Sequence, residues 1–387
     1  MKIREFSHRE PYEETLRANV RNILSVKERN VLVTAPGTDA AQIWYRHLLY
    51  DVYVPHNFDA EGRAWLARLY GYAPRRERRI PQWLVCQMSR LDPFHRLCLR
   101  PAFGTTVDFG TSSMIMPGNQ RFRLYQFQDQ TILSTTKHGF STDGLEAECA
   151  FRQRKDLPDF VMPCRIPAPN TMEEALLDAV PINRIWQQSL RDQVTLRLCI
   201  VLDKLRNMDV EMTTGPRYAA ILQSAFESAW QRLSDHFFGI TQNSQCTTLF
   251  HQATQTIQML KNVTLCRSHG DFQPGNLLMS PNGQMTVIDW EDTAIRSTAY
   301  DAMVYILNAH SPNGLADRAV AFLRSASPLP PHLDTCGLSR AQLLALRFCE
   351  DCIWQFQTAA RDGIYHIPDS LKSFFREAAN AIVSIHQ

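Results

Sequence analysis

The hydrophobic periodicity of the sequence changes from strand-like to helical near Pro181, and this change restricts the fold more than any other feature. The first part contains three strand-length segments separated by turn-forming residues: Ser112–Met116, Arg121–Phe127 and Thr131–Lys137. After Pro181, apolar residues recur at helical spacing. The pattern predicts an α+β chain, in which a small antiparallel β lobe precedes a large, mainly helical lobe.

A helix and two further extended segments complete the predicted β lobe. The helix is expected at Leu145–Arg154, directly after the third strand, and the extended segments at Phe160–Cys164 and Glu174–Leu177. In the helical lobe, Ser339 and Gln342 form the pattern of a capping box that opens a helix. The order of elements predicts a compact antiparallel unit with one helix, followed by helices.

A short β-hairpin is predicted inside the helical part. Leu277–Met279 and Met285–Ile288 are apolar segments of strand length, and Asn282-Gly283 between them is a strong signal for a hairpin turn. Such a hairpin brings the residue before its first strand close to the residue after its second strand. An isolated hairpin in a helical lobe therefore directs attention to its two flanks.

The flanks of this hairpin carry polar side chains suited to chemistry. Asp271 and Asn276 lie in the loop that precedes it, and Asp289 follows it, thirteen residues after Asn276. Two carboxylates and an amide oxygen that converge are suited to a hard cation such as Mg²⁺. A carboxylate that does not bind the metal can orient a hydroxyl and accept its proton. Gly, Pro, Asn and Asp are also common in ordinary turns, which is the alternative interpretation of these residues. The prediction of a metal site therefore depends on the order and spacing of both flanking segments.

The two flanking motifs, His-Gly-Asp-x-x-x-x-Asn and Ile-Asp-Trp-Glu, together resemble the aminoglycoside phosphotransferase/choline kinase family, which has a protein-kinase-like fold. The resemblance implies ATP and Mg²⁺ as cofactors, with Asp271 as catalytic base and Asn276 and Asp289 as Mg²⁺ ligands. It also implies structural support of the catalytic loop by His269 and by Asp301, which follows Asp289 by twelve residues.

The same resemblance implies nucleotide-binding residues in the β lobe. Lys137 would contact the α- and β-phosphates, and Glu148, or else Glu146, would pair with it from the next helix. Gly118 and Asn119 would cover the phosphates, although this loop has one Gly where protein kinases carry several. The alternative for Lys137 and Glu148 is a pair of solvated surface side chains.

The chain is expected to have three parts. Residues 1–100 form an N-terminal extension, mostly helical, which the core family does not need and which could bind a protein partner. Residues 101–178 form the kinase-like N-lobe, and residues 179–387 form the helical C-lobe with the catalytic loop. The fold expected from the resemblance is thus a bilobal kinase-like fold with an added N-terminal segment.

The predicted function is ATP- and Mg²⁺-dependent transfer of the γ-phosphoryl group to a hydroxyl of a small molecule, of the sugar, amino alcohol, nucleoside or antibiotic type. Glu291 and Asp292 follow the metal ligand and would suit a cationic or polyhydroxyl acceptor. Two alternatives remain open: a kinase of a protein or peptide, and a non-catalytic nucleotide-binding scaffold. The lack of an Ala-Pro-Glu sequence after Asp289 favours a small acceptor.

Composition argues against other classes of protein. The 387 residues include 41 Lys and Arg and 39 Asp and Glu, so the net charge of +2 gives no reason to expect nucleic-acid or membrane binding. Residues 1–14 are charged and do not suggest a secretory signal. The ten cysteines are then expected to be reduced, in a cytoplasmic protein. Cys349 and Cys352 are expected to be buried thiols of a helix.

Overall fold

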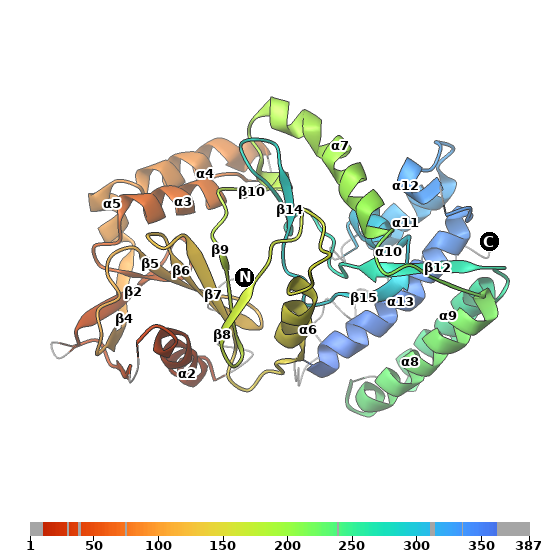
Figure 1. Cartoon of the computed structure of the whole chain (residues 1–387), viewed down its shortest axis with the longest axis horizontal. Helices are drawn as coiled ribbons and strands as arrows, with labels where there is room; N and C mark the ends of the chain where they lie inside the picture. The colour runs from red at the N-terminus through yellow and green to blue at the C-terminus, as the bar shows by residue number, and fades with distance from the viewer. Residues whose placement is uncertain are drawn as a thin grey trace. The chain divides into compact units, whose positions relative to one another are not determined.

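The computed structural model describes residues 11–28, 31–37, 40–73, 76–237, 240–309, 314–334 and 336–361 (Figure 1). The chain forms two compact units. The first comprises Met1–Val194 and Leu277–Ile288, and the second comprises Thr195–Asn276 and Asp289–Gln387. None of the helices in the described part of the chain combines the length and the apolar character that a membrane span requires.

A nine-stranded antiparallel sheet forms the centre of the first unit, in the order β1-β4-β2-β3-β5-β6-β7-β9-β8. Its strands are β1 (Val33–Thr34), β2 (Gln42–His47), β3 (Val52–Pro55), β4 (Leu99–Thr105), β5 (Ser113–Pro117), β6 (Arg121–Gln126), β7 (Thr131–Thr136), β8 (Arg165–Ala168) and β9 (Thr171–Ala175). Strands β5, β6 and β7 are the three segments predicted from the sequence, and they are neighbours in the sheet.

Helices cover both faces of this sheet. The helices of the first unit are α2 (Tyr12–Ser25), α3 (Ala60–Tyr70), α4 (Arg76–Met88), α5 (Asp92–Leu97) and α6 (Asp143–Arg152), and α7 (Gln188–Leu205) begins in it. Figure 1 shows the sheet between α2 and the pair α3 and α4. The adjacent residues Met114 and Ile115 point to opposite faces, each into a separate apolar cluster. Burial on both faces explains why strands such as β3 and β5 are almost continuously apolar.

The first hundred residues differ from the expected helical extension. Strands β1 to β4 belong to the same sheet as the predicted β lobe, and β3 pairs with β5 through Tyr53 and Ile115. Residue 100 lies inside β4, so the expected boundary divides a strand. Strands β2, β3 and β4 were missed because their apolar and polar residues do not alternate with a regular period of two.

The prediction of a strand at Phe160–Cys164 is also wrong. Val161 forms a single bridge to Val287, and the strand of this region, β8, begins at Arg165. Pro163 lacks the backbone N–H that a ladder needs, which accounts for the irregular path here. The segment expected at Glu174–Leu177 overlaps the end of β9 and is confirmed in part.

The second unit is mainly helical, as predicted. It contains most of α7, then α8 (Gly215–Phe237), α9 (Ile240–Gln258), α10 (Tyr300–Leu307), α11 (Leu315–Arg324), α12 (Pro331–Asp334) and α13 (Arg340–Arg361). A small antiparallel sheet joins β11 (Glu211–Thr213), β12 (Val263–Ser268) and β15 (Ala294–Ser297). Phe226 of α8 stacks on Phe250 of α9, with ring centroids 3.9 Å apart. Residues 362–387 of the expected C-lobe lie outside the described residues.

The capping box that opens α13 is confirmed. The backbone N–H of Gln342 donates to Oγ of Ser339 at 3.2 Å, and the backbone N–H of Ser339 donates to Oε1 of Gln342 at 2.8 Å. The helix then buries Cys349 and Cys352 completely, as expected for thiols of an apolar helix face. Local sequence therefore fixes both the start and the inner face of this helix.

The predicted hairpin is present and belongs to the first unit. Strands β13 (Leu277–Met279) and β14 (Met285–Val287) pair with each other, and β13 also pairs with β10 (Val180–Pro181), which precedes a short 3₁₀ turn, η1 (Ile182–Arg184). Gly283 has a φ of 79°, the left-handed conformation that the turn requires. Leu277 lies opposite Val287, so Asn276 directly precedes this pair and Asp289 follows it after one residue.

Candidate active site

The loop that follows β12 is held by Asp301, in the first turn of α10. The backbone N–H groups of His269 and Gly270 donate to Oδ2 and Oδ1 of Asp301, at 2.8 and 3.1 Å. Burial raises the pKa of Asp301, while the hydrogen bonds from the two N–H groups act in the opposite direction. Asp301 therefore lies where the resemblance implies a support for the catalytic loop.

Gly270 is a position of close backbone approach. Its φ is 94°, and a Cβ built on it would lie 2.2 Å from the backbone oxygen of Asp292. Only glycine satisfies both the left-handed conformation and the contact. Thr293 adds a further link, because its hydroxyl donates to the backbone oxygen of Ser268 at 2.9 Å. The loop is thus fixed against residues 292 and 293, just after the second motif.

His269 supports the loop from inside the protein. Its ring is fully buried and lies edge-on to Trp290, with ring centroids 4.6 Å apart. Its Nδ1 accepts the backbone N–H of Asp271 at 3.2 Å. Accepting through Nδ1 places the proton of a neutral imidazole on Nε2. His269 thereby fixes the backbone at Asp271 and stays away from solvent.

Asp271 and Asn276 are brought together by hydrogen bonds. Nδ2 of Asn276 donates to both Oδ2 and the backbone oxygen of Asp271, at 2.8 and 2.9 Å. Nε2 of Gln273 donates to the same Oδ2 at 2.8 Å. Both N–H bonds of the Asn276 amide are therefore engaged with Asp271, which leaves its Oδ1 as the atom that can bind a cation. Gln273 was not predicted from the sequence, where its only signal is its position between Asp271 and Asn276.

Asp289 adopts a left-handed backbone, with a φ of 68°. This conformation is uncommon for residues other than glycine, and non-glycine residues held in it concentrate at functional sites. Trp290 next to it is fully buried, whereas Asp289, Glu291 and Asp292 are half-buried. Asp289 thus stands between the end of the hairpin and an anchored Trp, with its carboxylate in a partly open position.

The residue types fit Mg²⁺ and do not fit a zinc-type site. In the described part of the chain, no three His, Cys, Asp or Glu side chains are arranged to hold a metal ion. The two expected metal ligands are the amide oxygen Oδ1 of Asn276 and the carboxylate of Asp289. Mg²⁺ takes oxygen ligands, keeps several waters and uses few protein groups beside substrate phosphates, so a pair of this kind suits it.

Lys137 is a buried residue of the first unit. It follows β7 directly and is 1% exposed, which excludes the alternative of a solvated surface lysine. Its backbone N–H donates to the backbone oxygen of Gln120 at 2.7 Å, so the β6–β7 pairing extends to this residue. Its Nζ lies 5.8 Å from the ring centre of Phe122 and 5.6 Å from that of Phe140. Its contact with phosphates stays a prediction.

Glu148 is buried among arginines. Its Oε2 lies 2.6 Å from Arg121 of β6, and its Oε1 lies 2.8 Å from Arg152 of α6. Arg152 also pairs with Glu174 at 2.7 Å. Burial acts to raise the pKa of Glu148, but the two arginines hold it well below its ordinary value. Each carboxylate oxygen thus has an arginine partner, and the pairing with Lys137 stays a prediction.

Glu146 differs from Glu148 in its surroundings. It is exposed and accepts the hydroxyl of Thr142 at 2.6 Å, at the start of α6. Of the two candidates, only Glu148 faces the interior of the first unit.

Gly118 and Asn119 lie in the turn between β5 and β6, where the N–H of Gly118 donates to the backbone oxygen of Arg121 at 2.7 Å. Their role as a phosphate cover also stays a prediction.

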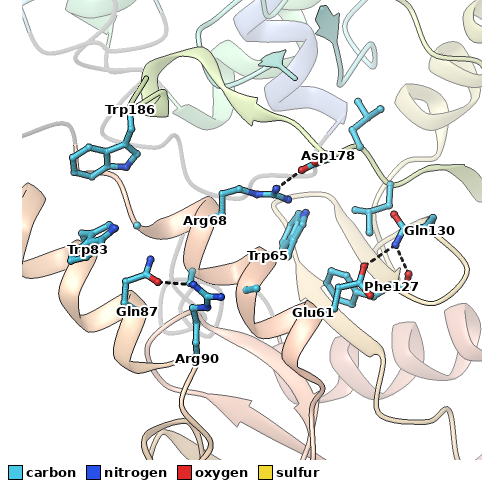
Figure 2. Close-up of a pocket in the computed structure, with 15 residues that line it drawn as sticks. Glu61, Trp65, Arg68, Trp83, Gln87, Arg90, Phe127, Gln130, Asp178 and Trp186 are labelled. Atoms are coloured by element: carbon cyan, nitrogen blue, oxygen red, sulfur yellow. Dashed lines mark hydrogen bonds and ion pairs between the residues drawn. The ribbon is translucent and has the colours of Figure 1, made fainter. Parts of the chain in front are cut away.

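A cavity of about 560 Å³ lies elsewhere in the first unit, and none of the predicted site residues lines it (Figure 2). Trp65, Trp83 and Trp186 line it, and Arg68 pairs with Asp178 across it. This cavity was not predicted from the sequence, because its walls come from α3, α4 and residues 127–130 and 176–186, which are far apart in the chain.

The predicted resemblance is confirmed over part of the chain. Residues 201–335 match the model of the phosphotransferase enzyme family. This segment contains the loop with Asp271 and Asn276, and it also contains Asp289 and Asp301. A search of curated proteins found no match.

Solved structures resemble the chain at low sequence identity. A choline/ethanolamine kinase family protein from Mesorhizobium loti is 11% identical, with a TM-score of 0.43, over 80% of this chain and 95% of that one. An aminoglycoside phosphotransferase in complex with ADP and hygromycin B is 12% identical, with a TM-score of 0.45. The match covers 72% of this chain and 92% of that one. Choline kinase LicA from Streptococcus pneumoniae is 14% identical, with a TM-score of 0.39. The match covers 70% of this chain and 94% of that one.

Proposed function

We propose that this protein is an ATP- and Mg²⁺-dependent phosphotransferase that moves the γ-phosphoryl group to a hydroxyl of a small molecule. The observation that carries the proposal is the Asp271–Asn276 pair, in which one amide donates twice to the aspartate and keeps its oxygen for a cation. The family match over residues 201–335 supports the same chemistry. The acceptor is proposed to be of the sugar, amino alcohol, nucleoside or antibiotic type.

Asp271 is proposed as the catalytic base. The amides of Gln273 and Asn276 both donate to Oδ2, which fixes the plane of the carboxylate. Asp301 and His269 hold the backbone on either side of the preceding Gly270. A carboxylate positioned in this way can align an acceptor hydroxyl and accept its proton as transfer proceeds.

Asn276 and Asp289 are proposed as the Mg²⁺ ligands. Bound Mg²⁺ would neutralise the negative charge of the phosphate oxygens. The chain contributes one amide oxygen at the end of the loop and one carboxylate at the end of the hairpin. The double donation from Nδ2 prevents the Asn276 side chain from turning, so its oxygen is already oriented before a cation arrives.

Residues of the first unit are proposed to bind the nucleotide phosphates. Lys137 would supply a cation, and Gly118 and Asn119 would cover the phosphates. Glu148 would act as a positioning residue, and its salt bridges to Arg121 and Arg152 support this role because they fix its carboxylate in the interior of the first unit. Glu291 and Asp292 are proposed to face a cationic or polyhydroxyl acceptor.

The proposal is tested by ADP release in the presence of ATP and Mg²⁺, with a panel of hydroxyl acceptors and one generic protein acceptor. Asp271→Asn is expected to lower turnover by about 10²–10⁴-fold and to retain nucleotide binding. Asp317→Asn, which changes an exposed aspartate of α11, is the matched control.

Near-normal turnover of Asp271→Asn would show that Asp271 is not the catalytic base. Transfer to the protein acceptor alone would favour a protein kinase, and nucleotide binding without any transfer would favour a scaffold.

A further inference from the structure

Two cysteines of the first unit lie together next to the Glu148 cluster. Cys149 follows Glu148 in α6, and Cys164 directly precedes β8. Cys149 packs with Leu145 and Met172, and Cys164 packs against the same apolar cluster. The two side chains also interact electrostatically, because each one shifts the pKa of the other. The two thiols therefore belong to the same small apolar cluster.

The two thiols differ in their access to solvent. Cys149 is 4% exposed, whereas Cys164 is half-buried. A dissolved reagent therefore meets Cys164 first, and Cys149 lies behind it. An accessible thiol next to a buried one is the arrangement in which a first reaction at the outer sulfur can be completed by the inner sulfur.

The surroundings of Cys164 favour its thiolate. The interaction with Cys149 lowers the pKa of Cys164; burial opposes this effect, and the nearby Arg152 guanidinium adds to it. The carboxylates of Glu148 and Glu174 act in the raising direction, but both pair with Arg152. Because the thiolate is the nucleophile, Cys164 is the more reactive of the two.

We propose that Cys149 and Cys164 form a redox modification site, at which a low-molecular-weight disulfide converts the two thiols into an intramolecular disulfide. The Cys164 thiolate attacks one sulfur of the reagent, and one reagent thiolate leaves. The Cys149 thiol then loses its proton and attacks the Cys164 sulfur of the mixed disulfide, and the second reagent thiolate leaves. The protein loses two electrons and two protons, and the reagent is reduced to two thiols.

The disulfide would tie α6 to the segment before β8. Since Glu148 directly precedes Cys149, the link would fix the helix that carries the Arg121–Glu148–Arg152 cluster. The inference concerns the first unit and does not depend on the proposed phosphotransfer. Its test can therefore fail while the phosphotransferase proposal stands, and the reverse also holds.

The experiment uses the full chain, fully reduced and then incubated with oxidised glutathione. Free thiols are blocked, and the peptides are analysed by mass spectrometry. The wild type is expected to give a cross-linked pair of peptides that contain Cys149 and Cys164, lighter by two hydrogens than the separate thiols. Cys349 and Cys352, fully buried in α13, are expected to stay reduced and serve as internal controls.

Two single variants separate the roles of the sulfurs. In Cys149→Ser, the mixed disulfide with glutathione is expected to accumulate on Cys164, because the second thiol is missing. In Cys164→Ser, Cys149 is expected to remain a free thiol, because it is buried. Cys199, a half-buried cysteine of α7, shows how far glutathione reacts with an ordinary thiol of this chain.

Three results would overturn the inference. The first is that Cys164 of the wild-type protein carries glutathione and no cross-link to Cys149 forms. Another is a Cys149→Ser variant whose Cys164 reacts no faster than Cys199. The third is a Cys164→Ser variant in which Cys149 is modified as quickly as Cys164 is in the wild type. Each is read from peptide masses and needs no enzymatic assay.

Discussion

The carboxylate of Asp301 accepts hydrogen bonds from two consecutive backbone N–H groups, those of His269 and Gly270, at 2.8 and 3.1 Å. One buried side chain thus sets the path of the backbone immediately before Asp271. The relationship joins the first turn of α10 to a loop some thirty residues earlier in the chain. It makes the geometry of the loop depend on a residue that need not touch a substrate.

Asp301→Asn is expected to weaken the loop, because an amide offers only one oxygen to the two N–H groups. One backbone donor is left without its acceptor, at a cost of about 1–3 kcal/mol. We expect a lower unfolding free energy in urea, together with reduced phosphotransfer. Asp317→Asn removes an exposed carboxylate of the same unit and serves as control. Unchanged stability and turnover in Asp301→Asn would contradict the assigned role.

Gly270→Ala is expected to abolish activity and to destabilise the second unit. The added Cβ would meet the backbone oxygen of Asp292, at a left-handed φ. Gly275→Ala is the matched control in the same loop, because a Cβ there has no neighbour within 4 Å. Melting temperature and ADP release are measured for both variants. Equal effects at the two glycines would show that the close approach at Gly270 is not what the loop requires.

Glu148→Gln is expected to destabilise the first unit by about 3–5 kcal/mol, because it leaves two buried arginines with one carboxylate, that of Glu174. Denaturant unfolding at neutral pH measures the effect. Glu146→Gln, on the exposed side of α6, is the control and is expected to stay close to wild type.

The stability of the wild type should also depend on pH through Glu148. Its pKa is lower in the folded state than the ordinary 4.5, so its contribution is complete above that value and is lost as the pH falls toward the folded pKa. The unfolding free energy of Glu148→Gln should therefore fall less than that of wild type on acidification below pH 4.5. Parallel pH curves for the two proteins would exclude this linkage.

Asn276→Ala is expected to raise the Mg²⁺ concentration needed for half-maximal turnover and to lower the maximal rate. The variant removes a cation ligand and also one of the two amides that orient Asp271. ADP release is titrated with Mg²⁺ for the variant and for Asn207→Ala, an exposed asparagine of the second unit. An unchanged Mg²⁺ dependence in Asn276→Ala would remove this residue from the metal site.

Local patterns in the sequence were sufficient for the hairpin of the first unit and for much of the second unit. The hairpin around Asn282-Gly283, the capping box at Ser339 and the buried thiols of α13 all rest on residues close in sequence, and all are confirmed. Part of the loop between His269 and Asn276 was predictable for the same reason, because the hydrogen bonds among His269, Asp271 and Asn276 join residues at most five positions apart.

Long-range contacts were not predictable from the sequence. The sheet pairing of β3 with β5 joins Tyr53 to Ile115, which are far apart in the sequence, and the four residues of β3 show no alternation of apolar and polar side chains. The pairing of Arg121 with Glu148 depends on how α6 packs on the sheet, which no local pattern specifies. Gln273 was overlooked because a polar residue in a loop has many roles, and only the coordinates show which oxygen it meets.

The hairpin between Asn276 and Asp289 has a consequence for how the protein can be divided. The chain leaves the second unit at residue 276, adds two strands to the first unit, and returns at residue 289. Neither unit is therefore encoded by one continuous stretch of the gene. A fragment that begins at residue 195 would carry β13 without its partner β10, so recombination with a relative at a single junction would exchange one unit only incompletely.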